Sequence, residues 1–223
     1  ANVLPTIASR CQPVRFDAPG SEAIAAQLER QGVAPDVARA CARLALGDAE
    51  RALGLALADG PALRHAAEAM ARAVIADRLA DAPWLALIEI ARGHGDAAAG
   101  DVRGRVAADL ELLPAKERKR AEREGEEQAK RAHRRTAAQG FDQGLALVGL
   151  WLRDVACVAD GADELVHHTD RLDALRADAA DRDPHRLRAG VALVDDTRAS
   201  LVLNPTEELA LEGLAYRLAR ALA

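Results

Sequence analysis

Apolar and polar residues alternate along this chain in helical periods that are separated by glycine and proline. Three short periodic segments come first, over residues 21–32, 35–47 and 48–60. In the second segment Val37, Cys41 and Leu44 recur at helical spacing, which predicts one apolar face. Ser21 and Asp48 stand where helix N-caps are expected. We therefore expect three short helices, too small a unit to be stable without neighbours.

Longer periodic segments follow the Gly60-Pro61 pair, where a domain boundary is expected. A helix beginning at Pro83-Trp84 is expected to stop at Gly93-His94-Gly95, and Gly100 and Gly104 weaken the segment after it. The next segment predicts one long helix or two helices joined near Gly140. In order, the expected longer helices cover residues 62–80, 83–93, 115–158, 171–182, 185–200 and 206–222.

The first 18 residues have a different pattern. Residues 5–11 predict one short helix and Pro13-Val14-Arg15-Phe16 predicts a single strand, which would need a partner strand. We therefore expect residues 1–18 to be the tail of a larger upstream domain. The expected organisation is completed by a small helical domain over 19–60 and a helical bundle over 61–223.

Composition supports an all-α fold, because aromatic residues make up only 2 % of the chain and Ala and Leu dominate the apolar positions. The formal charge of −5 argues against a surface that binds nucleic acid all over. No apolar run reaches the roughly 18 residues of a membrane span, and no signal-peptide pattern is present. We expect a soluble cytoplasmic protein in which Cys11, Cys41 and Cys157 are small buried thiols rather than a disulfide framework or a zinc site.

Catalytic or metal-binding motifs are scarce. The glycine-rich region 93–104 lacks the lysine and the preceding strand of a phosphate-binding loop. His167 and His168 are adjacent, which is poor for chelating one metal ion, so exposed imidazoles are expected. The chain by itself therefore does not indicate an enzyme, a cofactor site or a metal site.

The most highly charged stretch is residues 114–135, with nine Lys or Arg and five Glu. Glu126 and Glu127 precede Lys130 and Arg131 by four residues, the favourable order for ion pairs on a helix. The stretch is either a solvated helix face or a face that contacts phosphates. No aromatic residues are interleaved, so stacking on single-stranded bases is not expected.

One N-terminal motif is specific. Residues 4–16, LPTIASRCQPVRF, resemble the stretch after the sensor-1 strand of bacterial clamp-loader ATPases of the AAA+ class, in the gamma/tau and delta-prime subunits of DNA polymerase III. Residues 21–60, with ALGDAERAL at 45–53, resemble the helical lid that follows. Residues 150–166 and 204–222 resemble the collar domain of delta-prime. The resemblance therefore covers nearly the whole chain and favours delta-prime over gamma/tau.

The resemblance implies roles for particular residues. Arg10 would be the arginine finger presented in trans to ATP on a neighbouring subunit, with Ser9 and Cys11 supporting its loop. The sensor-2 arginine of the family is expected at the position of Glu50, and Arg51 is one helical step away, turned by about 100°. This departure is typical of a subunit that does not hydrolyse ATP itself.

The resemblance also implies partners. These are the gamma/tau and delta subunits, and through the complex the sliding clamp and primed DNA, as part of the DNA polymerase III holoenzyme. ATP-Mg would sit on a neighbour, and any zinc module would lie upstream. Apolar positions at Leu145, Leu147, Leu150 and Trp151 fit either the core or an interface between collars. An active gamma/tau-type ATPase fragment, a purely structural oligomerisation module and a nucleic-acid module using 114–135 remain alternatives.

Overall fold

The computed structural model describes residues 19–201 and 206–223, and within them every regular element is a helix, which confirms the all-α prediction. The α-helices are α2 (Ser21–Arg30), α3 (Pro35–Leu44), α4 (Ala49–Ala56), α5 (Gly60–Ile75), α6 (Leu85–Leu112), α7 (Ala115–Ala159), α8 (Leu172–Ala179), α9 (Pro184–Ser200) and α10 (Glu207–Leu222). Two short 3-10 helices, η1 (Asp163–Leu165) and η2 (Thr169–Arg171), connect α7 to α8.

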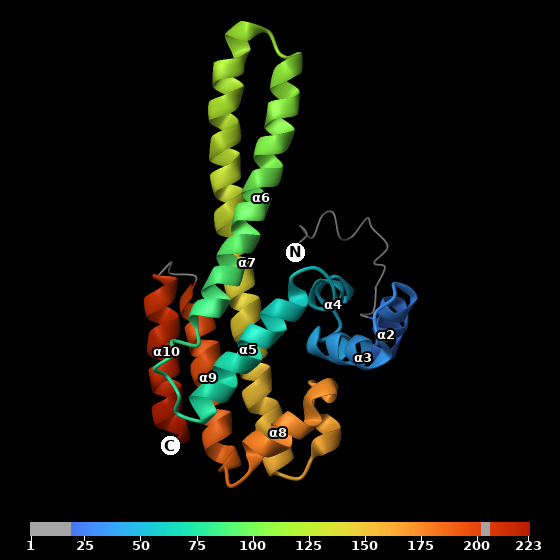
Figure 1. The fold of residues 1–223 in the computed structure, drawn as a ribbon, viewed down its shortest axis with the longest axis vertical. Coiled ribbons are helices and arrows are strands. Elements are labelled where there is room, and N and C mark those ends of the chain that lie inside the picture. Colours follow the sequence, from blue (N-terminus) through green and yellow to red (C-terminus); the bar gives the residue numbers. More distant parts are fainter. Residues whose placement is uncertain (1–18, 202–205) are drawn as a thin grey trace, which may run out of the picture.

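Helices α2, α3 and α4 form a small three-helix unit beside the main bundle (Figure 1). Ile24, Leu28, Leu44 and Leu55 are almost completely buried in it. The carboxylate of Asp48 accepts a hydrogen bond from the backbone N–H of Arg51 at 3.0 Å, which confirms the predicted N-cap of α4. The prediction for Ser21 was wrong, since it is the first helical residue and Gly20 is the cap.

Helices α5 and α9 pack on α7, and α10 packs on α9, α5 and α6. Trp151, Leu145 and Leu147 are at most 1 % exposed in this bundle, and Leu150 is half-buried against it. Of the two readings left open for these positions, the core is therefore the one that the structure supports. Helix α5 is shorter than the predicted 62–80, because the chain leaves it at Ile75 and Asp77 takes a left-handed φ of 53°.

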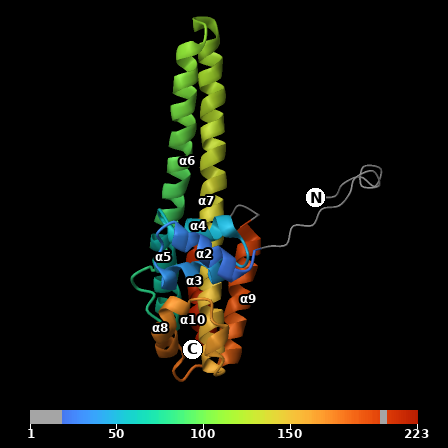
Figure 2. The ribbon, with the colours of Figure 1, turned by 90° about the vertical axis from the view of Figure 1, so that its right-hand side faces the viewer.

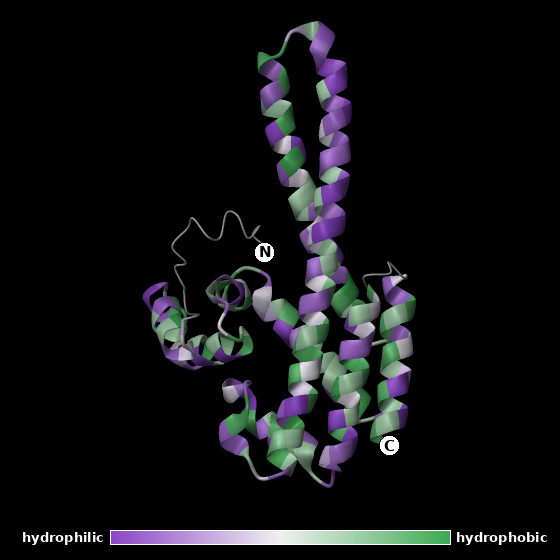
Figure 3. Cartoon of the chain, turned by 180° about the vertical axis from the view of Figure 1, so that it is seen from behind, coloured by the Kyte–Doolittle hydropathy of each residue, from purple (hydrophilic) through white to green (hydrophobic). Residues whose placement is uncertain are grey.

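Beyond the bundle, α6 and α7 continue as an antiparallel hairpin, which we call the arm (residues 96–135). It projects past the other helices in two perpendicular views (Figures 1 and 2). Its helix α7 runs for 45 residues without a break at Gly140, so one long helix is present rather than two. Figure 3 shows that hydrophobic residues concentrate in the bundle, whereas the arm part of α7 is largely hydrophilic.

The predicted helix stop at Gly93-His94-Gly95 was wrong, because α6 continues through it and through Gly100 and Gly104. Close helix packing explains part of this glycine content. A Cβ atom at Gly95 would lie 2.9 Å from the carbonyl oxygen of His133 on α7, and one at Gly140 would lie 3.1 Å from Ala91 on α6. These two glycines therefore allow close approach of two helix backbones instead of ending a helix.

Candidate functional site

The residues of the predicted trans-acting motif, Ser9, Arg10 and Cys11, lie outside the described residues, as do the helix expected over 5–11 and the strand expected over 13–16. Their roles stay predictions. The described residues contain three other places where charged or polar side chains gather. These are the start of α4, the junction around Asp154, and the arm.

At the start of α4, Glu50 and Arg51 face different surroundings. Glu50 is exposed, whereas Arg51 is half-buried and lines a groove of about 480 Å³ between α4 and α7, opposite Gln139 and Asp142. Two guanidinium nitrogens of Arg51, Nε and Nη2, have no hydrogen-bond partner among the described residues. Burial, and then repulsion from Arg198, lower the pKa of Arg51. The two neighbouring side chains thus differ in burial, although both line this groove.

Asp142 does not neutralise Arg51, because its carboxylate is already engaged. Arg198 of α9 donates to both of its oxygens, at 2.9 and 3.1 Å. The hydrogen bonds to Asp142 raise the pKa of Arg198. The groove thus combines the guanidinium of Arg51 with the carboxylates of Asp48, Glu50 and Asp142 and with the side-chain amides of Gln139 and Gln143.

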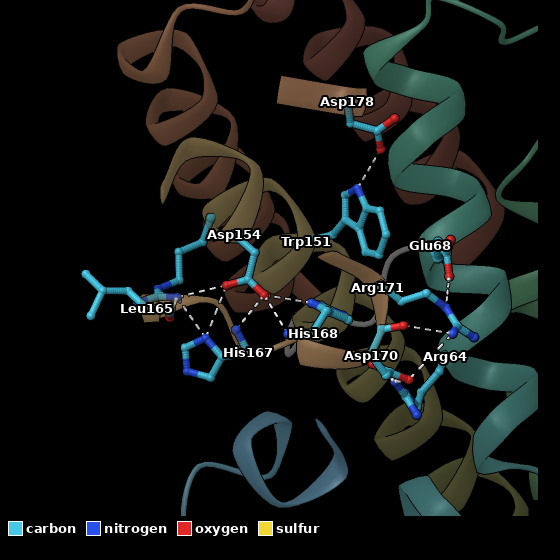
Figure 4. A network of polar contacts seen from close by, with 11 residues as sticks. Arg64, Glu68, Trp151, Asp154, Leu165, His167, His168, Asp170, Arg171 and Asp178 are labelled. Carbon is cyan, nitrogen blue, oxygen red and sulfur yellow. Dashed lines mark hydrogen bonds and ion pairs between the residues drawn. The ribbon is translucent and has the colours of Figure 1, made fainter. Parts of the chain in front are cut away.

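A second cluster is built on Asp154, whose side chain is completely buried near the end of α7. Its Oδ2 accepts the backbone N–H groups of His167 and His168 at 2.8 and 2.9 Å. The Nδ1 atoms of both rings also contact its carboxylate, at 3.2 Å for His167 and 2.8 Å for His168 (Figure 4). Arg153 adds a contact of 2.8 Å to Oδ1. Five contacts from three residues thus converge on this one carboxylate.

The ionised form of Asp154 is strongly favoured. Burial alone would raise its pKa, but the hydrogen bonds from His167 and His168 outweigh burial and hold the pKa of Asp154 far below its usual range. The expectation of two exposed imidazoles was therefore wrong, since His168 is only 5 % exposed. The signal that was missed is an aspartate placed directly among the apolar residues of LWLRDVACV, which requires a polar partner when it is buried.

Further contacts join this junction to its neighbours. The indole N–H of Trp151 donates to Asp178 of α8 at 3.0 Å, and its ring lies edge-on to His168 with centroids 5.0 Å apart. Arg64 of α5 donates to both oxygens of Asp170 at 2.7 and 2.9 Å. Figure 4 shows these residues directed toward one another from α5, α7 and the 3-10 segments.

The junction has the marks of a structural element. The cavity beside His168, Arg64 and Arg171 has a volume of about 200 Å³. Typical ligand pockets are larger, at roughly 300–1,000 Å³. In the described ranges, 19–201 and 206–223, no group of three or more His, Cys, Asp or Glu side chains is arranged to hold a metal ion. We assign this network to fixing the turn between α7 and α8.

The cysteines do not add a reactive site among the described residues. Cys41 is buried, as predicted, and Arg64 Nη1 lies 3.4 Å from its sulfur. Burial raises the pKa of Cys41, so the thiol is protonated at neutral pH. Cys157 is only partly buried, and Cys11 lies outside the described part of the chain.

Comparison with known proteins gave no family: no family model, no curated protein and no solved structure matches this chain. Within the described residues, no helix combines the length and the apolar character that crossing a bilayer requires.

Proposed function

We propose that the chain belongs to a subunit of a bacterial DNA polymerase III clamp loader, of the delta-prime type, and that it helps to load the sliding clamp onto primed DNA without hydrolysing ATP itself. The observation that carries the proposal is the stretch LPTIASRCQPVRF at residues 4–16, with its Ser9-Arg10-Cys11 step. In this proposal residues 1–18 are the end of an AAA+ core, 19–60 the lid and 61–223 the collar.

The order of the described helices supports this assignment without depending on a known relative. A unit of three short helices, α2 to α4, follows the motif immediately, and a bundle of longer helices follows that unit. The lid and the collar of the proposed subunit type are expected in the same order. In this proposal the boundary between them is Gly60-Pro61, which stands in the first turn of α5.

The surroundings of Glu50 and Arg51 support a subunit without its own ATPase activity. A carboxylate at the sensor-2 position repels a γ-phosphate instead of binding it. Arg51 is half-buried and lines the groove between α4 and α7 together with the exposed Glu50 and with Gln139 and Asp142. Arg10 would then act on ATP of a neighbouring subunit, where a guanidinium offsets the charge that builds up on the transferred phosphoryl group.

The test is an Arg10→Ala substitution in the full-length subunit, assembled with its partner subunits. We expect an intact complex whose DNA-stimulated ATPase activity is lower by at least severalfold. Arginine fingers contribute about 10³–10⁵ in rate in other systems. Arg15→Ala, in the same stretch, is the matched control and should leave the ATPase rate unchanged. Arg10→Lys should not restore activity, because an ammonium lacks the planar bidentate fork of a guanidinium.

Two results would contradict the proposal. Unchanged ATPase activity in an assembled Arg10→Ala complex would remove the trans-acting role. Hydrolysis of ATP by the full-length subunit alone would favour the gamma/tau type, the alternative in which Arg51 serves its own nucleotide. Light scattering of the mixed subunits reports assembly independently of both.

A further inference from the structure

The arm carries a one-sided concentration of positive charge. On α7, a set of exposed residues follows at spacings of one, three and four, which places them on the helix face opposite the buried Gly125. We call this face the basic stripe; its residues are Lys116, Lys119, Arg120, Arg123, Glu127, Lys130, Arg131 and Arg134. All eight are exposed, and seven of them are basic. Over these residues the stripe is about 27 Å long at 1.5 Å per residue.

The opposite face of the same helix explains why the charges are held in line. Gly125 and Ala129 are buried against α6, and a Cβ at Gly125 would lie 2.6 Å from a methyl group of Val106. The two helices are therefore in close contact along this side. This contact fixes the rotation of α7, so that the stripe points to solvent.

Most of the positive charge on the stripe is not neutralised within the described residues. Only two of its basic side chains form ion pairs, Arg120 with Glu124 at 2.8 Å and Lys130 with Glu127 at 3.1 Å. The other five are free of ion pairs across the described ranges: Lys116, Lys119, Arg123, Arg131 and Arg134. A face that served only to stabilise its own helix would be expected to alternate charges of opposite sign.

A groove on one side of the arm extends the positive surface toward α6. Its volume is about 870 Å³, and six residues of the stripe, five of them basic and the sixth Glu127, line it together with Arg103 of α6. Val106, Ala107 and Leu110 supply apolar wall, while Glu122 and Glu126 contribute negative charge. Glu126 is itself held by Arg103, with two contacts of 2.9 Å. The groove and the stripe together form one predominantly basic surface.

The chain as a whole is acidic although the surface of the arm is basic, and the position of the arm reconciles the two. The chain has a formal charge of −5, and residues outside 114–135 carry −9. Electrostatic interactions are largely screened beyond about 8 Å at physiological salt. The arm extends past the bundle (Figures 1 and 2), and most of the acidic residues lie outside residues 96–135. A polyanion can therefore approach the stripe without strong repulsion from the bundle.

The residue types on the stripe indicate the kind of polyanion. No Phe, Tyr or Trp occurs between Trp84 and Phe141, so stacking on unpaired bases is not provided. The stripe has no Asn or Gln for contacts to base edges. A straight row of Lys and Arg matches the closely and regularly spaced phosphates of a duplex, which are read without regard to sequence.

We propose that the basic stripe of the arm binds the phosphate backbone of double-stranded nucleic acid. This inference concerns the chain by itself and does not depend on the role of Arg10. Binding is sequence-independent and releases counterions. With five to seven phosphate contacts, log K falls against log salt with a slope of about −4 to −6.

The experiment measures fluorescence anisotropy of a short labelled DNA duplex with the whole chain, from low to physiological salt. The test variant is the triple Arg123→Gln, Arg131→Gln and Arg134→Gln, which removes three charges of the stripe that are not in ion pairs. We expect its affinity to fall at least about tenfold and the salt slope to become shallower by about 3, one unit for each lost contact. A duplex RNA of the same length tests the shared backbone chemistry, and binding of either duplex supports the proposal.

The matched control removes the same charge elsewhere, with Arg39→Gln, Arg186→Gln and Arg220→Gln on α3, α9 and α10. These arginines are also exposed. The control should bind like the unmodified chain, and circular dichroism should show that all three proteins are equally helical. An equal loss of binding in the control would overturn the proposal, because net charge alone would then explain it.

Two other outcomes would also overturn it. The first is absence of duplex binding by the unmodified chain at low salt. The second is tighter binding to poly-glutamate or to vesicles of anionic phospholipid than to duplex, measured at the same salt. Those results would assign the stripe to an acidic protein segment or to a membrane surface instead.

Discussion

The two halves of helix α7 are packed against their neighbours by side chains of different size. Its C-terminal half buries large side chains, including Trp151, Leu152 and Leu145, between α5, α8 and α9. Its N-terminal half lies in the arm and buries mainly Gly125 and Ala129 against one other helix. Full burial of a large apolar side chain contributes about 1.5–3 kcal/mol, much more than a glycine or alanine can. Most of the stability should therefore reside in the bundle, which leaves the outer face of the arm free to carry charge.

The largest expected effect is that of Trp151→Ala in the bundle half. This change removes a completely buried indole and its hydrogen bond to Asp178, so the free energy of unfolding should fall by about 3–5 kcal/mol. Leu112→Ala at the end of the arm is the control, because Leu112 is 86 % exposed and its truncation should cost less than about 0.5 kcal/mol. Chemical denaturation followed by circular dichroism measures both. Equal losses would show that the arm contributes to the core as the bundle does.

The next effect concerns the charge buried in the bundle half. Asp154→Asn should lower the free energy of unfolding by about 3 kcal/mol at neutral pH, because it removes one partner of a buried charged network. The folded-state pKa of Asp154 is depressed, so the contribution of its carboxylate is complete above the unfolded-state pKa of about 3.9 and is lost as pH falls through the folded-state value.

The stability gap between the unmodified chain and Asp154→Asn should therefore narrow as pH falls from about 5 toward 2. Urea denaturation at a series of pH values measures this gap. Asp81→Asn, at an exposed position between α5 and α6, is the control and should change the free energy of unfolding at neutral pH by less than about 0.5 kcal/mol. A gap for Asp154→Asn that stayed constant across this range would mean that folding does not lower the pKa of this carboxyl group.

The smallest effects test the packing of α6 against α7 at the base of the arm, and their signs should be opposite. Gly95→Ala places a methyl group 2.9 Å from the carbonyl oxygen of His133. Overpacking of about 1–3 kcal/mol outweighs a helix-propensity gain of about 1 kcal/mol, so we expect a net loss of about 1 kcal/mol. Gly93→Ala has open space around it and should gain about 0.5–1 kcal/mol. Thermal unfolding measures the change in stability of the two variants. An increase in stability for both would argue against close contact of α6 with α7.

The sequence was most informative where structure depends on near neighbours. The period of large apolar residues predicted that helices occupy most of the bundle, and it marked Trp151 as a residue of either the core or an interface. The N-cap at Asp48 was predicted because it depends on one carboxylate and a backbone N–H three residues away. The separation into lid and collar domains stays a prediction.

The sequence was misleading where a partner distant in the chain decides the outcome. Gly95 is compatible both with a helix stop and with close helix packing, and only the position of His133 distinguishes the two. His168 could not be paired with Asp154 from the sequence, because the chain must first turn back through η1 before the two meet. The basic stripe was partly visible in the composition of 114–135, but its orientation depends on which face of α7 contacts α6.

The continuity of α7 has a mechanical consequence. No cap or loop interrupts its 45 residues, so it acts as a single beam of about 68 Å that begins at the outer end and terminates beside the buried carboxylate of Asp154. A sideways load at the tip is transmitted as a tilt at the other end, since there is no joint to absorb it. The arm can thus transmit a displacement of its tip to the helices of the bundle.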